Sequence, residues 1–173
     1  MRYSYHMSEI VLIAHNLRST HNVGSLLRTA EGLGVTEVIL SGYTPYPLQA
    51  HDDRLPHLAQ KINRQITKTA LGAEQTQAWS HTVDIVQTLN RLQRAGFWVA
   101  AIEQAVGSTP LPSFQAPPKL ALIVGREVEG IEPELLARCN QVLEIPMFGH
   151  KESFNVVQAA AMGLYQVTFR ETL

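Results

Sequence analysis

The chain has 173 residues, of which 45% are hydrophobic and 17% are charged, a balance that suits one globular domain with a core and excludes an intrinsically disordered chain. Lys and Arg number 14 against 15 Asp and Glu, which gives a net charge of -1. This near neutrality excludes a histone-like surface that is basic throughout, but it leaves room for a local basic patch.

Cysteine content and hydropathy further limit the class of protein. The one cysteine, Cys139, excludes an internal disulfide or a cysteine-rich zinc site, and we interpret it as a small core or helix-end residue. No apolar run approaches the roughly 20 residues that a membrane-spanning helix needs, and the first ten residues lack the apolar region of a secretory signal. We therefore expect a soluble, cytoplasmic protein that forms a single domain over residues 1–173.

Short apolar runs along the chain predict buried strands. They cover residues 10–14, 35–40, 97–102, 120–124 and 142–145. The runs are rich in β-branched residues and poor in charge, as expected of strands that are covered on both faces. Residues 85–95 between them have apolar side chains at helical spacing, and Gly96 follows as a natural end of that helix. The alternation predicts an α/β fold with a mostly parallel sheet and helices on both faces.

Two further segments, residues 109–118 and 55–70, have distinct patterns. The proline-rich residues 109–118 are expected to form a loop between two strands. Residues 55–70 predict a helix in which Leu58, Ile62 and Ile66 form a stripe that docks on the sheet. A second face of this helix carries four basic or imidazole side chains, namely His57, Lys61, Arg64 and Lys68. This face is either an ordinary solvated surface or a surface that follows phosphates.

The first polar motif directly follows the first predicted strand. It contains Asn16 and Arg18 and continues through residues 21–28, HNVGSLLR. Asn22 and Gly24 suit a turn into a helix that begins near Ser25, which would place Arg28 in the first turn or so. The motif is therefore either a capped helix with an exposed arginine or a polar site at the carboxyl end of a strand, where open α/β sheets bind ligands.

The second motif is VGREVEG at residues 124–130, again directly after a predicted strand. Two glycines flank Glu127, so the backbone could approach a ligand closely. The segment lacks the third glycine of a dinucleotide fingerprint and the GK[ST] of a phosphate loop, which argues against a dehydrogenase or another nucleotide-binding enzyme. The alternative is a tight turn before a helix that starts at Pro133.

The third motif spans residues 145–155, IPMFGHKESFN, and leads into a predicted helix over residues 156–167. Ser153 is a suitable N-cap for that helix. The helix is apolar nearly all round, so it should be buried on more than one side. We favour a dimer interface over burial within one subunit as the reason.

Together these segments resemble the SpoU (TrmH-like) branch of the SPOUT superfamily of RNA methyltransferases. The matching residues, in the family's order, are N-x-R with HNVGSLLRTA, then IVGREVEGI, then IPMFGHKESFNVVQAAAMGLY. The resemblance implies an α/β fold with a C-terminal trefoil knot, which general rules of chain topology would have rejected. It also implies a homodimer through the C-terminal helix, S-adenosylmethionine as cofactor, and no metal. Some members of the family carry an amino-terminal RNA-binding domain, but the motifs spread across nearly all of this chain, and we expect no separate RNA-binding domain in it.

The resemblance further implies roles for individual residues. The implied cofactor contacts are Ile102, Glu103, Gly125, Ile145, Met147 and Ser153. Arg28 would be the central catalytic residue, acting as a cation rather than as a base, because a guanidinium stays protonated near neutral pH. Asn22, Glu127 and Asn155 would orient Arg28 and the ribose.

The implied reaction is methyl transfer to a ribose 2'-hydroxyl of RNA, with tRNA favoured over rRNA. RNA would be held by Arg18 and by the basic face of residues 57–68. A non-catalytic RNA-binding or assembly factor with the same fold is the alternative. Methylation of a base is a further possibility, which the SFN motif and Arg28 disfavour.

Overall fold

The computed structural model describes residues 8–169, and its centre is a seven-stranded sheet whose strands are all parallel. The spatial order is β3-β2-β1-β6-β4-β7-β5. The strands are β1 (Glu9–His15), β2 (Glu37–Ser41), β3 (Trp79–Thr82), β4 (Trp98–Ile102), β5 (Thr109–Pro110), β6 (Lys119–Val124) and β7 (Gln141–Glu144). The helices are α1 (Thr20–Gly32), α2 (Pro56–Ala70), α3 (Ala73–Thr76), α4 (Ile85–Arg94), α5 (Pro133–Leu136) and α6 (Val156–Thr168), with one 3-10 turn at Leu111–Ser113. The α/β class predicted from the alternating pattern is confirmed.

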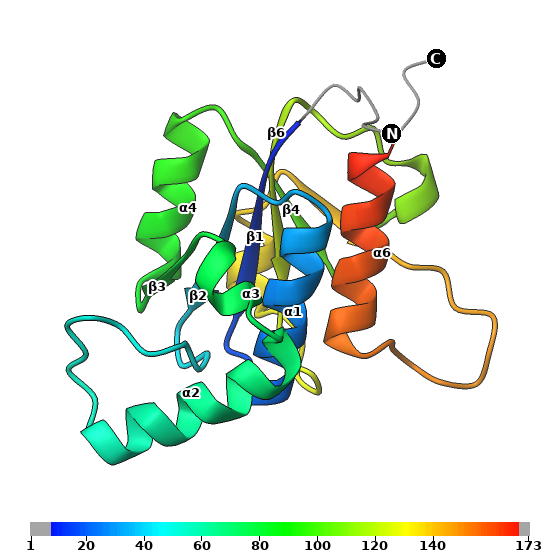
Figure 1. Cartoon of the computed structure of the whole chain (residues 1–173). Coiled ribbons are helices and arrows are strands. Elements are labelled where there is room, and N and C mark those ends of the chain that lie inside the picture. The colour runs from blue at the N-terminus through cyan, green and yellow to red at the C-terminus, as the bar shows by residue number, and fades with distance from the viewer. Residues whose placement is uncertain (1–7, 170–173) are drawn as a thin grey trace, which may run out of the picture.

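The sheet is buried on both faces by different helices (Figure 1). Alternate residues of β1 point to opposite sides, so Leu12 packs with α1, α2 and α6, whereas Ile13 packs with α4 and α5. Both side chains have no exposed surface. This two-sided burial explains why the central strands read as unbroken apolar runs rather than as an alternating pattern.

Two edge strands are absent from the sequence-based prediction. β3 has the sequence WSHT and its four residues are all half-buried, so it lacks the apolar run that identifies the central strands. β5 is a two-residue strand inside the segment predicted to be a loop, and it pairs with β7. Edge strands need fewer apolar side chains, because one side faces solvent.

Helix α1 begins earlier than predicted. The Ser19 side chain accepts a hydrogen bond from the Asn22 backbone N–H at 3.2 Å, so the helix starts at Thr20 rather than near Ser25. Asn22 therefore lies in the first turn and Arg28 in the third. Gly24 lies inside the helix, where the sequence had indicated a turn.

Gly24 is needed because α2 crosses α1 at this point. A Cβ atom on Gly24 would overlap the Thr69 hydroxyl and the Ile66 carbonyl oxygen. Ile66 and Ala70 of α2 are buried in the same core cluster as α1, Ile62 packs against it, and Leu58 is 44% exposed. The predicted stripe through Leu58 was thus wrong in its first residue, and the helix docks mainly on α1 instead of on the sheet.

The start of α6 also differs from the prediction. Asn155, and not Ser153, is the N-cap: its side chain accepts from the Val157 N–H at 2.9 Å, and Gln158 accepts from the Asn155 N–H at 3.3 Å. This reciprocal pair is a capping box. Among residues 8–169, no helix is both long and apolar enough to cross a bilayer.

Replacing Gly24 tests the close contact between α1 and α2. Gly24→Ala should lower the free energy of unfolding by about 2–3 kcal/mol, because the new methyl group meets backbone that cannot yield. Gly32→Ala in the same helix is the control, since a Cβ there has open space, and it should be neutral or stabilising by up to about 1 kcal/mol. Chemical denaturation measures both values, and equal effects of the two substitutions would contradict this packing.

Candidate functional site

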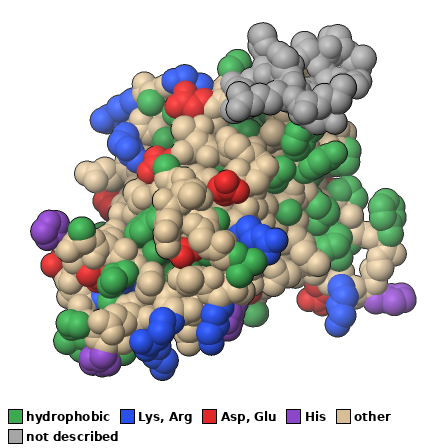
Figure 2. All heavy atoms as spheres, viewed as in Figure 1, with side chains coloured by type: hydrophobic (Ala, Val, Ile, Leu, Met, Phe, Trp, Pro, Cys, Tyr) green, Lys and Arg blue, Asp and Glu red, His purple; other side chains and the backbone are tan. Residues whose placement is uncertain are grey.

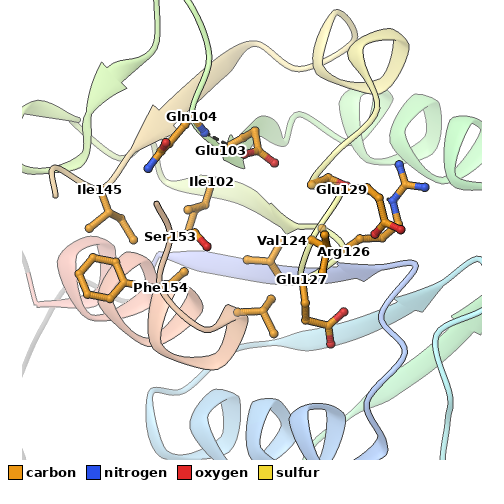
Figure 3. Close-up of a pocket in the computed structure, with 15 residues that line it drawn as sticks. Ile102, Glu103, Gln104, Val124, Arg126, Glu127, Glu129, Ile145, Ser153 and Phe154 are labelled. Atoms are coloured by element: carbon orange, nitrogen blue, oxygen red, sulfur yellow. Dashed lines mark hydrogen bonds between the residues drawn. The ribbon is translucent and has the colours of Figure 1, made fainter. Parts of the chain in front are cut away.

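The loops that follow β4, β6 and β7 enclose a pocket at the carboxyl edge of the sheet (Figure 3). Its cavity volume is about 180 Å³. The lining residues are Ile102, Glu103, Gln104, Val124, Gly125, Arg126, Glu127, Val128, Glu129, Gly130, Ile145, Ser153, Phe154, Val156 and Ala159. Parallel strands end at one edge, so segments that are far apart in the chain meet here.

The structure brings most of the predicted cofactor contacts together. Five of them line this pocket, namely Ile102, Glu103, Gly125, Ile145 and Ser153, while Met147 is absent from the lining. Sequence reasoning missed Gln104, Phe154 and Ala159, which line the pocket as well. The only signal in the sequence that could have identified these residues was their proximity to the motif residues. Gln104 also donates to the Glu152 carbonyl oxygen at 2.8 Å and so links the loops after β4 and β7.

The two glycines of the second motif allow close packing within the protein. A Cβ on Gly125 would overlap Ile131, and one on Gly130 would overlap the Glu103 carboxylate. Gly130 also has a φ of +68°, which favours glycine. Both glycines also line the pocket, so the close approach of a ligand to their backbone stays a prediction.

Glu103 has a structural task besides facing the pocket. Its Oε2 accepts from the Ile131 N–H at 2.9 Å, and its Oε1 accepts from the Gln104 N–H at 2.9 Å. The carboxylate thus closes the far end of the loop formed by residues 125–130, which we call the pocket loop. Any contact of Glu103 with a bound molecule would use its remaining acceptor capacity.

The first and second motifs meet through one hydrogen bond. Asn22 Nδ2 in the first turn of α1 donates to Glu127 Oε1 at 2.9 Å. Glu127 lies in the pocket loop and lines the pocket. Two residues given related roles from the resemblance therefore touch each other at the edge of the pocket.

Arg28 lies elsewhere in the single chain. It is exposed and lines a shallow groove with Ser25, Thr29 and Thr69. Arg28 follows Asn22 by six residues, so at 3.6 residues per turn their side chains point about 120° apart around α1. Within one chain, Asn22 therefore points toward the pocket loop, and Arg28 points from a different face of the same helix.

Ser153 and Asn155 differ in how they are used. Ser153 is exposed and lines the pocket. Asn155 is also exposed, but its side-chain oxygen is occupied by the cap of α6. The position of Asn155 beside the pocket is thus explained by helix capping, and a part in orienting a ribose stays a prediction.

The basic face of α2 is open to solvent. His57, Lys61, Arg64 and Lys68 are all exposed, and none of them belongs to the ion pairs found within residues 8–169. Figure 2 shows these side-chain types along the lower edge of the molecule, where α2 runs. Arg18, in contrast, pairs with Glu129 of the pocket loop at 2.8 Å.

Other reactive groups do not add to the site. Cys139 packs partly buried against the core, burial raises its thiol pKa to about 11, and the thiol donates to the Leu135 carbonyl oxygen at 3.4 Å. This confirms its interpretation as a core residue. In the part of the chain that the structure describes, no cluster of three or more His, Cys, Asp or Glu side chains is placed to hold a metal ion.

Known structures share this fold. The AdoMet-bound rRNA methyltransferase from Sinorhizobium meliloti superposes with a TM-score of 0.75 at 22% identity, over 95% of this chain and 60% of that one. The TrmH/SpoU tRNA modifying enzyme from A. aeolicus also gives a TM-score of 0.75 at 21% identity, over 92% of this chain and 73% of that one. These likenesses confirm the expected fold class, the SPOUT knot fold.

Sequence comparisons identify the family. A Staphylococcus aureus protein assigned to the TrmH family of tRNA/rRNA methyltransferases is 30% identical over 157 residues, which is 91% of this chain and 57% of that protein. A Staphylococcus haemolyticus relative is 29% identical over the same span. The chain thus spans little more than half the length of these curated relatives. The SpoU rRNA Methylase family matches residues 9–165, so this chain belongs to the SpoU family.

Proposed function

We propose that this chain transfers a methyl group from S-adenosylmethionine to a ribose 2'-hydroxyl of RNA. The observation that carries the proposal is the convergence of the three motifs at one pocket. Five residues expected at the cofactor line that pocket, and Glu127 on its wall binds Asn22 of the first motif. Membership of the SpoU family supports the same reaction.

The lining of the pocket fits such a cofactor. Ile102, Ile145 and Phe154 supply apolar surface for an adenosine, and the carboxylates of Glu103 and Glu127 favour a cationic sulfonium. When bound, S-adenosylmethionine supplies an electrophilic methyl carbon: the ribose oxygen bonds to this carbon, the carbon–sulfur bond breaks with its electron pair staying on sulfur, and the 2'-proton passes to solvent.

Arg28 is the proposed catalytic residue, and its charge is the reason. A ribose hydroxyl is a weak acid, so the difficult part of the reaction is the forming alkoxide. A guanidinium remains protonated and cannot serve as a base, but it stabilises the developing negative charge and holds the neighbouring phosphate through paired N–H groups. Asn22 and Glu127 would orient the ribose at the pocket.

A second copy of the chain would bring Arg28 to the pocket. Within one chain, Arg28 lies outside the pocket. Helix α6 packs beside α1 and leaves apolar side chains uncovered, including Tyr165 at 63% exposure. Figure 2 shows hydrophobic side chains gathered on the flank where α6 lies. We therefore propose a homodimer through α6, with each site completed by Arg28 of the other subunit.

Within RNA, we propose tRNA as the substrate, held by the basic face of α2. The similarity to the tRNA modifying enzyme from A. aeolicus supports tRNA, whereas the S. meliloti structure is of an rRNA methyltransferase. Arg18 would join the basic face by exchanging Glu129 for a phosphate. That exchange is inexpensive, because an exposed ion pair contributes little free energy.

Arg28→Ala should abolish methyl transfer and leave cofactor affinity intact. Loss of a group that stabilises only the transition state lowers the rate by a factor on the order of 100 or more, while S-adenosylhomocysteine affinity should stay within about twofold. The rate of methyl transfer is measured with labelled methyl groups on separate tRNA and rRNA fractions, and the affinity for S-adenosylhomocysteine is measured by calorimetry. Label in rRNA alone would contradict the choice of tRNA.

The control is Arg94→Ala, which removes an exposed arginine on α4, across the sheet from α1. It should change neither quantity. Collapse of cofactor binding in Arg28→Ala would instead give Arg28 a structural role. RNA binding without any methyl transfer by the wild-type chain would favour the non-catalytic alternative.

The basic face of α2 is tested by reversing its charge. Lys61→Glu with Lys68→Glu should weaken tRNA binding. It should also flatten the plot of the logarithm of the binding constant against the logarithm of salt concentration, by about 1.5 in slope if two phosphate contacts are lost. Arg91→Glu with Arg94→Glu on α4 makes the same charge change across the sheet and should have a smaller effect. Filter binding across a salt series gives both slopes, and an unchanged slope removes α2 from the RNA surface.

A further inference from the structure

A chain of polar contacts lies behind the pocket loop and has no part in the proposed reaction. It links Arg126 to Glu132, Glu132 to Asn16, and Asn16 to His15. These residues come from the pocket loop, from the start of α5 and from the end of β1. We call the four side chains the loop anchor.

Arg126 connects the anchor to the pocket loop. Arg126 is one of the pocket-lining residues, and its guanidinium extends to the side of the loop opposite Ser153 and Ile102 (Figure 3). Arg126 Nε donates to the Gly130 carbonyl oxygen at 3.2 Å, and the Gly130 N–H donates to the Arg126 carbonyl oxygen at 3.2 Å. The guanidinium therefore ties the two ends of the loop together from behind.

Glu132 holds that guanidinium. Its Oε1 lies 3.2 Å from Arg126 Nη2 and accepts from Asn16 Nδ2 at 3.3 Å. Burial alone raises the pKa of Glu132, but its backbone amide, His15 and Arg126 outweigh burial and lower it. The carboxylate is thus ionised at neutral pH. Its Oε2 is buried, forms no hydrogen bond among the described residues, and faces His15 Nε2 at 3.4 Å.

Asn16 and His15 fix Glu132 to the sheet. Asn16 has a φ of +56°, its Oδ1 accepts from the Tyr43 N–H at 3.2 Å, and its Nδ2 lies 3.0 Å from His15 Nε2. His15 Nδ1 lies 3.0 Å from Ser41 Oγ. His15 Nε2 also lies 3.4 Å from Glu132 Oε2. Burial lowers the His15 pKa, and this outweighs the opposing effect of Glu132.

We propose that Glu132 is a positioning residue that holds the pocket loop in its binding shape through Arg126. The inference rests on the proposed function, since it concerns the pocket expected to bind the cofactor. Glu132 is absent from the pocket lining, so it acts only through the loop. A loop that is already ordered costs less conformational entropy on binding, and this raises affinity without touching the reaction.

Glu132→Gln tests the proposal because it keeps the shape and removes the charge. Affinity for S-adenosylhomocysteine, measured by calorimetry, should fall about tenfold, as expected for one charged hydrogen bond. The kcat at saturating cofactor and the affinity for RNA should stay within about twofold. Hydrogen exchange of the Gly130 amide in the ligand-free protein should become about tenfold faster.

A double-mutant cycle asks whether Glu132 acts through Arg126. Arg126→Ala should weaken binding at least as much, and adding Glu132→Gln to it should weaken binding no further. Glu134→Gln removes an exposed carboxylate two residues after Glu132, outside the pocket lining, and it should change binding less than twofold. Thermal unfolding of every variant identifies any loss of the fold.

The outcomes separate this inference from the proposed function. If wild-type protein fails to bind S-adenosylhomocysteine, the proposed function is contradicted and the role of Glu132 falls with it. If wild-type protein binds but Glu132→Gln keeps its affinity and its exchange rate, only the inference is overturned. Additive losses in the double mutant also overturn it, because Glu132 would then act by another route.

Discussion

Burial of a parallel sheet on both faces is the constraint from which the rest of the structure follows. Side chains of β1 such as Leu12 and Ile13 are fully enclosed by helices on opposite sides, so the strands themselves have no room for polar chemistry. Because the strands are parallel, their carboxyl ends share one edge. The polar motifs of the chain follow β1, β6 and β7, and they meet at this edge. Asn22 and Glu127, for example, are in contact although they lie 105 positions apart in the sequence. Site and core are thus two consequences of one arrangement.

The sequence predicts the parts of this fold that depend on local pattern and leaves out those that depend on a distant partner. Central strands are recognisable because burial on both sides demands an apolar run, whereas β3, with its half-buried WSHT, resembles a loop. Gly24 reads as a turn residue, because nothing local reveals that Ile66 and Thr69 lie against it. In the site, five of the six cofactor contacts implied by the resemblance line one pocket. It cannot place Arg28 relative to the pocket, because that depends on which face of α1 each side chain occupies.

Many polar residues at the strand ends bind one another rather than a ligand. Glu103 closes the pocket loop, Asn155 caps α6, and Glu132 holds Arg126. Such contacts satisfy groups that would otherwise be buried without partners, and they shape the pocket that other residues line. The net charge of -1 is compatible with a local basic surface, because Lys61, Arg64 and Lys68 are exposed together on α2.

The central claim is that each active site is shared between two chains, with Arg28 of one facing the pocket of the other. The direct measurement is methyl transfer by mixed dimers of Arg28→Ala with Ser153→Trp, a pocket-filling variant first checked for loss of S-adenosylhomocysteine binding. Each variant alone should be inactive. In a closed twofold dimer, random mixing makes half of the dimers mixed, and one of their two sites is then intact, so about a quarter of wild-type activity should return. A mixture as inactive as its components would contradict the shared site.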